Sequence, residues 1–216
     1  MPSDLPAADR PLLFFDTETT GLPDFGKPAD DPAQPRIAAI CMMLATPEGR
    51  TIDVHYQMVR PDGWTMPAEV TAINGLTTEM LETFGASIGF ALNWFAEAMT
   101  WRPVLVAHNA SFDLKMLRGE LRRAGLPDRY EDTDSFCTMK AATPLCRLPP
   151  TDRMMASGRK GWKSPNLAEA LSHFFAGERL PDAHDCLYDT MACRRVFLAI
   201  RAALTAVHTD DMEDFR

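Results

Sequence analysis

Short apolar runs alternate along this chain with segments of helical periodicity. Residues 11–15 form one continuous apolar run that ends at Asp16, which is typical of a strand covered on both faces. Residues 36–44 and 51–59 predict two further strands, and the Pro-Glu-Gly sequence at 47–49 predicts a hairpin turn between them. This order indicates three antiparallel neighbours in one sheet.

The middle of the chain carries helical patterns before a fourth strand. Residues 67–73 and 78–84 predict short helices, and Ser87 is a suitable N-cap for a longer helix. Apolar residues recur at helical spacing in that longer helix, at Ile88, Leu92, Phe95 and Met99. Residues 103–107 then predict the fourth strand.

Strands and helices continue to interleave in the second half. Residues 108–111 predict a loop before a helix that ends at Gly125, and a short fifth strand is predicted around residues 132–137. Two more helices are predicted, one over residues 167–175 and one after Pro181. The order predicts an α/β fold with a mixed sheet.

The bulk composition is that of an ordinary globular domain. The chain has 216 residues, of which 46% are hydrophobic and 24% charged, enough for one domain with a substantial core. We divide it into an N-terminal extension (residues 1–10), the folded domain (11–207) and an acidic tail (208–216). Its longest apolar run, residues 37–45, is too short to span a bilayer, so no membrane association is predicted.

The N-terminus and the cysteines predict a cytoplasmic protein. The first residues show no basic region followed by an apolar stretch, so no secretory signal is visible. The cysteines are odd in number and include no C-x-x-C pair: Cys41, Cys137, Cys146, Cys186 and Cys193. Reduced thiols are therefore favoured over disulfides or zinc.

The charge distribution leaves two interpretations open. A net charge of −8 argues against a nucleic-acid binder, yet an enzyme that gathers carboxylates around cations can be acidic overall. One segment, residues 147–163, carries five basic residues (Arg147, Arg153, Arg159, Lys160 and Lys163) against one acidic residue, Asp152. It is either a solvated surface loop or a mobile loop that grips the phosphates of a nucleic-acid strand.

Asp16 and Glu18 are the first candidates for chemistry. Side chains at i and i+2 of an extended segment point the same way, so both carboxylates can face one site. They follow a predicted central strand, at the end where α/β sheets place their ligands. Two carboxylates this close favour a cation between them, and hard oxygen ligands suit Mg²⁺ or Mn²⁺. Two solvated acids at a strand end would look the same in sequence.

Three further residues join this set by their position. Asp113 falls in the first turn of the helix after the fourth strand, where it either complements the helix dipole or faces the same sheet edge. His184 and Asp189 are five residues apart, so on one helix their side chains would diverge by roughly 140°. Both can reach one site only if His184 lies at or before the helix start.

Together these residues form a pattern that resembles a known family. The stretches 14–22 (FFDTETTGL), 107–113 (AHNASFD) and 184–189 (HDCLYD) resemble the three motifs of the DEDDh exonucleases. These are relatives of the DNA polymerase III epsilon proofreading subunit, with a ribonuclease H-like fold. Residues 35–37 and 73–77 also look like family landmarks, so the resemblance covers nearly the whole chain.

The resemblance implies a fold, a cofactor and a reaction. The fold would be a five-stranded mixed sheet, three antiparallel strands followed by two parallel ones, flanked by helices, and residues 11–207 would be the exonuclease domain. Two Mg²⁺ or Mn²⁺ ions would be held by four carboxylates: Asp16 on both ions, Glu18 and Asp189 on the ion that binds the attacking water, and Asp113 on the other. His184 would act as general base, since an imidazole titrates near neutral pH. The products would be nucleoside 5′-monophosphates and a strand shortened from its 3′ end.

The resemblance also implies a set of substrate-binding residues around the terminal nucleotide. They are Thr19, Leu22, Leu76, Asn109 and Phe112. The alternative is ordinary core or turn packing, and for Leu22 and Leu76 the two interpretations carry equal weight. Asn74 stands where many relatives have histidine, which puts any contact by its side chain in doubt. His108 is expected to be structural, and Asp134 is left out of the site.

Several functional alternatives remain after the resemblance. The first motif favours DNA over RNA, the substrate of an exoribonuclease or oligoribonuclease, but the motifs do not distinguish the sugars. A single-stranded 3′ end is the expected substrate, and a double-stranded one is left open. A non-catalytic nucleic-acid-binding module is disfavoured by the complete set of four acids and a histidine. A polymerase partner is not visible in the sequence, and neither the oligomeric state nor the pathway, such as proofreading, repair or turnover, follows from it.

Overall fold

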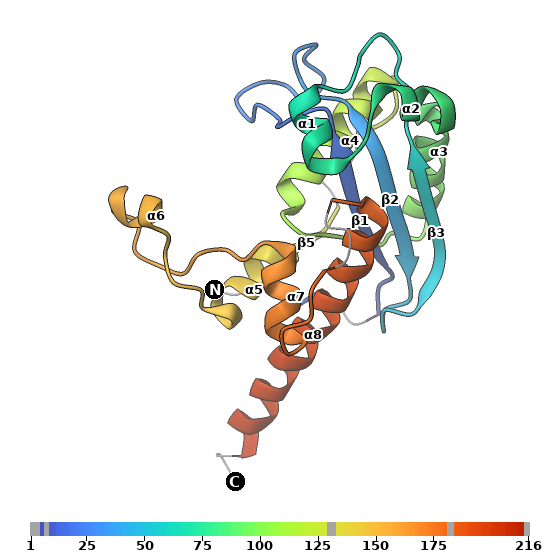
Figure 1. Cartoon of the computed structure of the whole chain (residues 1–216). Coiled ribbons are helices and arrows are strands. Elements are labelled where there is room, and N and C mark those ends of the chain that lie inside the picture. The colour runs from blue at the N-terminus through green and yellow to red at the C-terminus, as the bar shows by residue number, and fades with distance from the viewer. Residues whose placement is uncertain (1–4, 7–8, 129–132, 181–183, 214–216) are drawn as a thin grey trace.

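The five strands form one mixed sheet with β1 at its centre (Figure 1). A computed structural model describes residues 5–6, 9–128, 133–180 and 184–213. The strands are β1 (Leu12–Thr19), β2 (Ile37–Ala45), β3 (Thr51–Met58), β4 (Val104–Ala107) and β5 (Ser135–Cys137), in the spatial order β3-β2-β1-β4-β5. The first three strands pair antiparallel, and β1–β4 and β4–β5 pair parallel. The predicted sheet is confirmed.

Eight helices are described around this sheet. They are α1 (Ala68–Asn74), α2 (Thr78–Phe84), α3 (Ile88–Met99), α4 (Ala110–Arg123), α5 (Thr138–Cys146), α6 (Asp152–Ala156), α7 (Leu167–Phe174) and α8 (Cys186–Glu213). Helices α3 and α4 cover one face of the sheet, and α5, α7 and α8 cover the other. This layering explains why β1 and β2 read as continuous apolar runs, since both of their faces are buried.

Alternate residues of β1 enter two separate cores. Phe14 packs edge-on against Phe197 of α8, with ring centroids 5.5 Å apart, whereas Phe15 packs among residues of α3 and α4. The strand continues this alternation past its apolar part. Asp16 and Glu18 therefore point to the α8 side of the sheet, and Thr17 points to the α4 side.

Most predicted helix starts are confirmed by their caps. The Ser87 side chain accepts the Gly89 N–H at the start of α3, and Asn166 and Glu169 form a reciprocal capping box on α7. The predicted loop at 108–111 is too long by two residues. Asn109 adopts a left-handed conformation with φ 68°, which asparagine tolerates, and this turns the chain into α4 at once.

Three helical segments were not expected from the pattern. Helix α5 contains Pro144, which disrupts the sequence signal, but its first turns bury Thr138, Ala141 and Ala142 against the sheet. Helix α6 is a five-residue turn inside the basic segment. Helix α8 continues through residue 208, where an acidic tail is predicted to begin, and is helical as far as Glu213.

Candidate active site

The two acids of the first motif lie where β1 extends beyond its parallel neighbour. Pairing with β4 ends at Phe14, whereas β1 runs on to Thr19. Asp16 and Glu18 therefore stand at the carboxyl end of the central strand, in the gap that the shorter β4 leaves. Glu18 is only 9% exposed.

Helix α4 brings a third carboxylate to the same place. Asp113, in its first turn, is 2% exposed. Its Oδ1 accepts the backbone N–H of Thr17 at 3.0 Å and the Thr17 hydroxyl at 2.9 Å. The residue between the two motif acids thus fixes the third acid, because Thr17 is the one that faces α4.

The start of α8 supplies the last acid and the histidine. His184 lies two residues before the helix, as its predicted role requires, and has a left-handed backbone with φ 73°. Its N–H donates to Oδ2 of Asp189 at 3.3 Å. Asp185 caps the helix, since its Oδ1 accepts the Leu187 N–H at 2.9 Å.

These residues form a group that can hold a cation. One ligand atom from each of Glu18, His184 and Asp189 lies within 4.8 Å of the other two. Oδ1 of Asp189 is buried and has no hydrogen-bond partner among the described residues. A buried carboxylate oxygen without a donor needs a compensating positive charge. A hard divalent ion fits this donor set.

The raised pKa values of the carboxyl groups indicate a site for a positive charge. Burial raises the pKa of Glu18 to about 8, helped by Asp189 and Asp113 and opposed by a hydrogen bond with the Asn74 side chain. Burial also raises the pKa of Asp113 to about 7, against the hydrogen bonds from Thr17, and that of Asp189 to about 6. The pKa of Asp16 lies well above its usual value, through burial and then through the charges of Asp113, Asp189 and Glu18. Four such acids can ionise together only around cations.

The predicted substrate-binding residues have different surroundings. Leu22 is 86% exposed, whereas Leu76 is buried and lines a hollow of about 180 Å³ beside Glu18 and His184. The Thr19 hydroxyl donates to the Gly21 carbonyl at 2.8 Å. Asn109 forms the left-handed turn before α4, and Phe112 packs partly buried against the α3–α4 core. Leu76 therefore offers apolar surface in the hollow, and Leu22 offers it on the loop after β1.

Two residues of this site were not identified from the sequence. Asn74, at the end of α1, lines the same hollow, and its side-chain hydrogen bond lowers the pKa of Glu18. Thr17 is the other, because the D-x-E pattern treats its middle position as variable. A hydroxyl between two acids on an extended strand is a signal that could have been used, because it must face the opposite side.

His108 and Asp134 lie in structural surroundings, as expected. The ring of His108 contacts the Thr138 hydroxyl at 3.0 Å and the Pro165 carbonyl at 3.1 Å, and burial lowers its pKa to about 4. Asp134 forms an ion pair with Arg10. Neither belongs to the carboxylate group.

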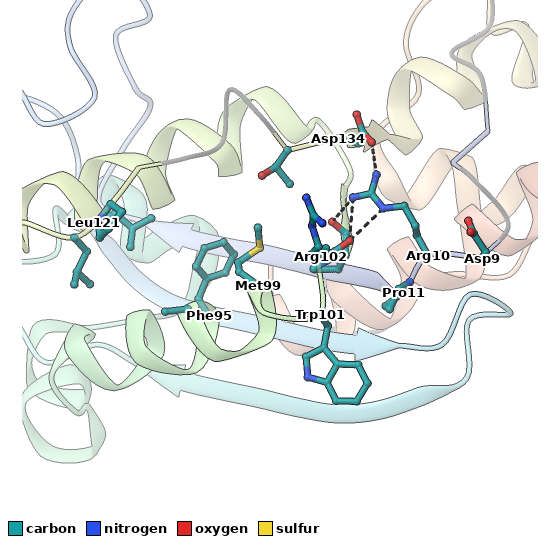
Figure 2. A pocket seen from close by; sticks show the side chains of 14 residues that line it. Asp9, Arg10, Pro11, Phe95, Met99, Trp101, Arg102, Leu121 and Asp134 are labelled. Atoms are coloured by element: carbon teal, nitrogen blue, oxygen red, sulfur yellow. Dashed lines mark hydrogen bonds and ion pairs between the residues drawn. The ribbon is translucent and has the colours of Figure 1, made fainter.

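A larger hollow lies at the opposite end of the sheet (Figure 2). Its volume is about 930 Å³, and its lining includes Pro11 and Pro103, which precede β1 and β4, together with Phe95 and Trp101. Arg10 crosses it to Asp134 and to the carbonyl oxygens of residues 102 and 103. No candidate catalytic residue lines it.

The basic segment, residues 147–163, projects from the rest of the molecule (Figure 1). Figure 1 shows α6 projecting away from the sheet and the helices that pack on it. Leu148 and Lys163 form an isolated bridge at the base of this projection. Of the five basic residues, the predicted strand-gripping ones are Arg153, Arg159, Lys160 and Lys163. The first three are exposed, and Lys163 is engaged at the start of α7, where it pairs with Glu169.

None of the described helices combines the length and the apolar character that crossing a membrane requires.

Relatives among curated proteins are exonucleases or resemble a polymerase subunit. Three-prime repair exonuclease 1 of Bos taurus is 28% identical over 211 residues, which cover 87% of this chain and 62% of that protein. A DNA polymerase III subunit epsilon-like protein of Rhodobacter capsulatus is 32% identical over 210 residues, covering 94% of this chain and 25% of that protein. The chain thus spans less than two thirds of the length of these relatives.

Solved structures share the fold. Exonuclease I of E. coli in a zinc-bound complex with single-stranded DNA aligns with a TM-score of 0.69 at 15% identity, covering 90% of this chain and 41% of that one. A product-bound exonuclease I aligns with a TM-score of 0.68 at 18% identity, covering 90% and 44%.

A family model settles the assignment. The model described as "Exonuclease" (RNase_T) matches residues 13–197, which include all three motifs. The resemblance to the DEDDh exonucleases, the relatives of the DNA polymerase III epsilon subunit, is confirmed, and the chain belongs to the exonuclease family.

Proposed function

We propose that this protein is a metal-dependent 3′→5′ exonuclease that releases nucleoside 5′-monophosphates from DNA 3′ ends. One observation carries the proposal: carboxylates from β1, α4 and α8 meet at the end of the central strand, with His184 beside them. These groups are distant in sequence and costly to bury together. A site for divalent cations explains why the fold gathers them.

The four carboxylates would hold the metal. The charges of Asp113, Asp189 and Glu18 raise the pKa of Asp16, so the four carboxylates are close enough that all of them would hold the cations. The free oxygen of Asp189 is available for this contact. Two Mg²⁺ or Mn²⁺ ions would neutralise the charge that develops on the phosphate and stabilise the attacking and leaving oxygens.

His184 would accept the proton of the attacking water. Its side chain is exposed at the rim, where an incoming phosphodiester can reach it. Its backbone is fixed by the N–H bond to Asp189, so the imidazole is placed relative to the carboxylates by the main chain. Histidine is the side chain that most often acts as a general base in proton transfer at neutral pH.

The terminal nucleotide would bind beside Glu18. Leu76 and Asn74 line the hollow there, and the exposed Leu22 stands at the start of the loop after β1. Thr19 supports that loop through Gly21, while Asn109 and Phe112 shape the start of α4. The apolar pair Leu22 and Leu76 would separate the terminal base from the rest of the strand.

The basic projection would hold the strand further from its end. Arg153, Arg159 and Lys160 are exposed cations in a protein of net charge −8. Such side chains bind phosphates without reading sequence. This preference for backbone contacts suits an enzyme that must move along any sequence.

DNA is favoured as substrate by the relatives. One is named as a repair exonuclease and another as polymerase-subunit-like, and one of the exonuclease I structures is a complex with single-stranded DNA. A single-stranded 3′ end is accordingly the proposed substrate.

One digestion experiment tests the proposal. End-labelled single- and double-stranded DNA and RNA are incubated side by side with the protein, with Mg²⁺, with Mn²⁺ or with a chelator. We expect stepwise shortening of single-stranded DNA from its 3′ end, release of 5′-monophosphates, and no reaction in chelator. Faster digestion of RNA than of DNA would make RNA the substrate. Cleavage in the presence of chelator would contradict the proposed metal dependence.

A further inference from the structure

The loop between β1 and β2 presents an exposed aromatic side chain that nothing in the fold explains. Phe25 is 61% exposed, and it lies three residues after Leu22, which is 86% exposed. Exposed phenylalanine side chains are common singly and carry no meaning by themselves. This one differs because the loop that carries it is rigid and borders the catalytic carboxylates.

An internal amide holds the loop in one shape. The side chain of Gln34 is buried, accepts the Asp24 N–H at 2.9 Å and donates to the carbonyl oxygens of Asp24 and Pro28 at 2.7 and 3.0 Å. The Asp24 carboxylate in turn accepts the Gly26 N–H at 2.9 Å. The backbone on both sides of Phe25 is therefore fixed by hydrogen bonds.

The loop is also fastened along the length of α4. A Cβ atom added at Gly119 would lie 2.5 Å from the Ala29 carbonyl oxygen, so the two backbones are in direct contact there. One turn later, Arg123 donates to the Asp31 carbonyl at 3.3 Å. Near the start of the helix, the Lys115 ammonium donates to the Lys27 carbonyl at 2.6 Å.

The same lysine supplies a charge beside the aromatic ring. The ammonium of Lys115 lies 5.4 Å from the centroid of the Phe25 ring. Lys115 is only two residues beyond Asp113, a rise of about 3 Å along the helix. Residues two apart on a helix differ in direction by about 200°, so Lys115 lies on another face of α4 than Asp113. The ring and the cation are held beside the first turns of that helix. Figure 1 shows this loop at the end of the molecule where α1 and α2 also lie.

We infer that Phe25 and Lys115 form a preformed stacking platform for a nucleobase of the substrate strand, upstream of the nucleotide being removed. The ring offers its exposed face to the base, and Lys115 neutralises an adjacent phosphate. Aromatic stacking with a nearby cation is the usual way of holding single-stranded nucleic acid without sequence preference. Because the loop is ordered beforehand, binding costs little conformational entropy.

This inference rests on the proposed exonuclease function, and two substrates separate them. One is a short single-stranded DNA oligonucleotide, and the other is the p-nitrophenyl ester of thymidine 5′-monophosphate, which contains only one nucleotide. Phe25→Ala should raise KM for the oligonucleotide by roughly 5- to 100-fold, the size of one lost stacking contact. It should leave kcat, and both constants for the ester, unchanged.

Matched variants test the physical cause. Phe25→Trp should keep the wild-type KM, because it preserves a flat ring. Gly119→Ala, which pushes Ala29 away from α4, should raise KM for the oligonucleotide alone. Phe90→Ala removes a ring of similar exposure, 64%, from α3 and should change nothing. A strand carrying 2-aminopurine at successive positions should lose fluorescence quenching at one internal position in Phe25→Ala.

Each outcome decides between the claims. If the wild-type protein cleaves neither substrate, the exonuclease proposal fails. If it cleaves both and Phe25→Ala retains its KM for the oligonucleotide, the platform does not exist. Equal losses on oligonucleotide and ester would show a structural role for Phe25 and would also overturn the inference.

Discussion

The backbone N–H of His184 donates to Oδ2 of Asp189 at 3.3 Å, so the proposed general base is fixed by a proposed metal ligand. The bond leaves Oδ1 of Asp189 free, and the exposed His184 has a ring nitrogen within 4.8 Å of carboxylate oxygens of Asp189 and Glu18. It uses the main chain of His184, so the two roles can be separated by changing only the side chain.

His184→Ala should therefore remove the base and spare the metal site. We expect kcat to fall by roughly 10²–10⁴-fold, the usual contribution of a general base. The increase in melting temperature on adding Mg²⁺ should persist, because the N–H bond to Asp189 remains. Steady-state kinetics measure the fall in kcat, and thermal melts measure the shift with Mg²⁺. His173→Ala on α7 is the control. Loss of the metal-induced shift would make His184 a ligand instead.

Asp16→Asn should abolish cleavage and stabilise the metal-free protein at neutral pH. Burial and the charges of three neighbouring carboxylates raise the pKa of Asp16, so its ionised form is unfavourable without a cation. The amide removes that charge but keeps the shape. We expect a higher melting temperature than wild type in chelator and a smaller gain from Mg²⁺. A variant that degrades DNA at the normal rate would refute the metal site.

The metal-free protein should lose stability as pH rises from about 5 to about 8. In the unfolded chain these carboxyls ionise near pH 4, whereas in the folded protein the pKa values are about 6 for Asp189, about 7 for Asp113 and about 8 for Glu18. Over this range the folded state binds more protons, so its stability decreases with pH.

Saturating Mg²⁺ should flatten this dependence, because the ion replaces the protons. Melting temperatures measured across the pH range in chelator and in Mg²⁺ test the sign. A metal-free protein that becomes more stable towards pH 8 would contradict the burial of ionisable acids at this site.

The sheet and the acids could be predicted because their signals are local. An apolar strand followed by Asp16-x-Glu18 fixes both the element and the direction of the carboxylates through the two-residue period. His184 could be placed before α8 because a spacing of five does not fit one helical face. The antiparallel pairing of β2 and β3 followed from the short hairpin connection at residues 46–50.

Other features depend on contacts between distant segments and could not be predicted. Thr17 binds Asp113 across 96 positions, and Asn74 reaches Glu18 only because α1 ends beside β1. Helix α5 was missed because Pro144 dominates the local signal while small buried residues carry the packing. The rigidity of the loop after β1 rests on Gln34 and Gly119, which look unremarkable in sequence.

The basic projection should contribute through charge alone. Replacing both Arg159 and Lys160 with alanine should raise KM for single-stranded DNA and leave kcat unchanged, because both side chains are exposed and far along the chain from the carboxylates. The slope of log affinity against log salt should become shallower by up to about 1.4 for two lost phosphate contacts. Lys163→Ala is the matched control, since Lys163 pairs with Glu169 and should leave the slope unchanged. An unaltered slope in the double variant would show that the projection is an ordinary solvated loop.

A phosphate at the 3′ end of the strand should block digestion, and a phosphate at the 5′ end should not. The terminal nucleotide would occupy the hollow of about 180 Å³, whose wall includes Glu18 and Asp185. A terminal phosphate in this hollow would bring negative charge close to these carboxylates. Like charges at short range in a buried site are strongly unfavourable. A 5′ phosphate would lie at the far end of the strand and meet none of these groups. Matched oligonucleotides with each end phosphorylated, digested in Mg²⁺, give the answer directly. Digestion that proceeds from a 3′-phosphorylated strand but stops at a 5′-phosphorylated one would reverse the polarity assigned to the enzyme.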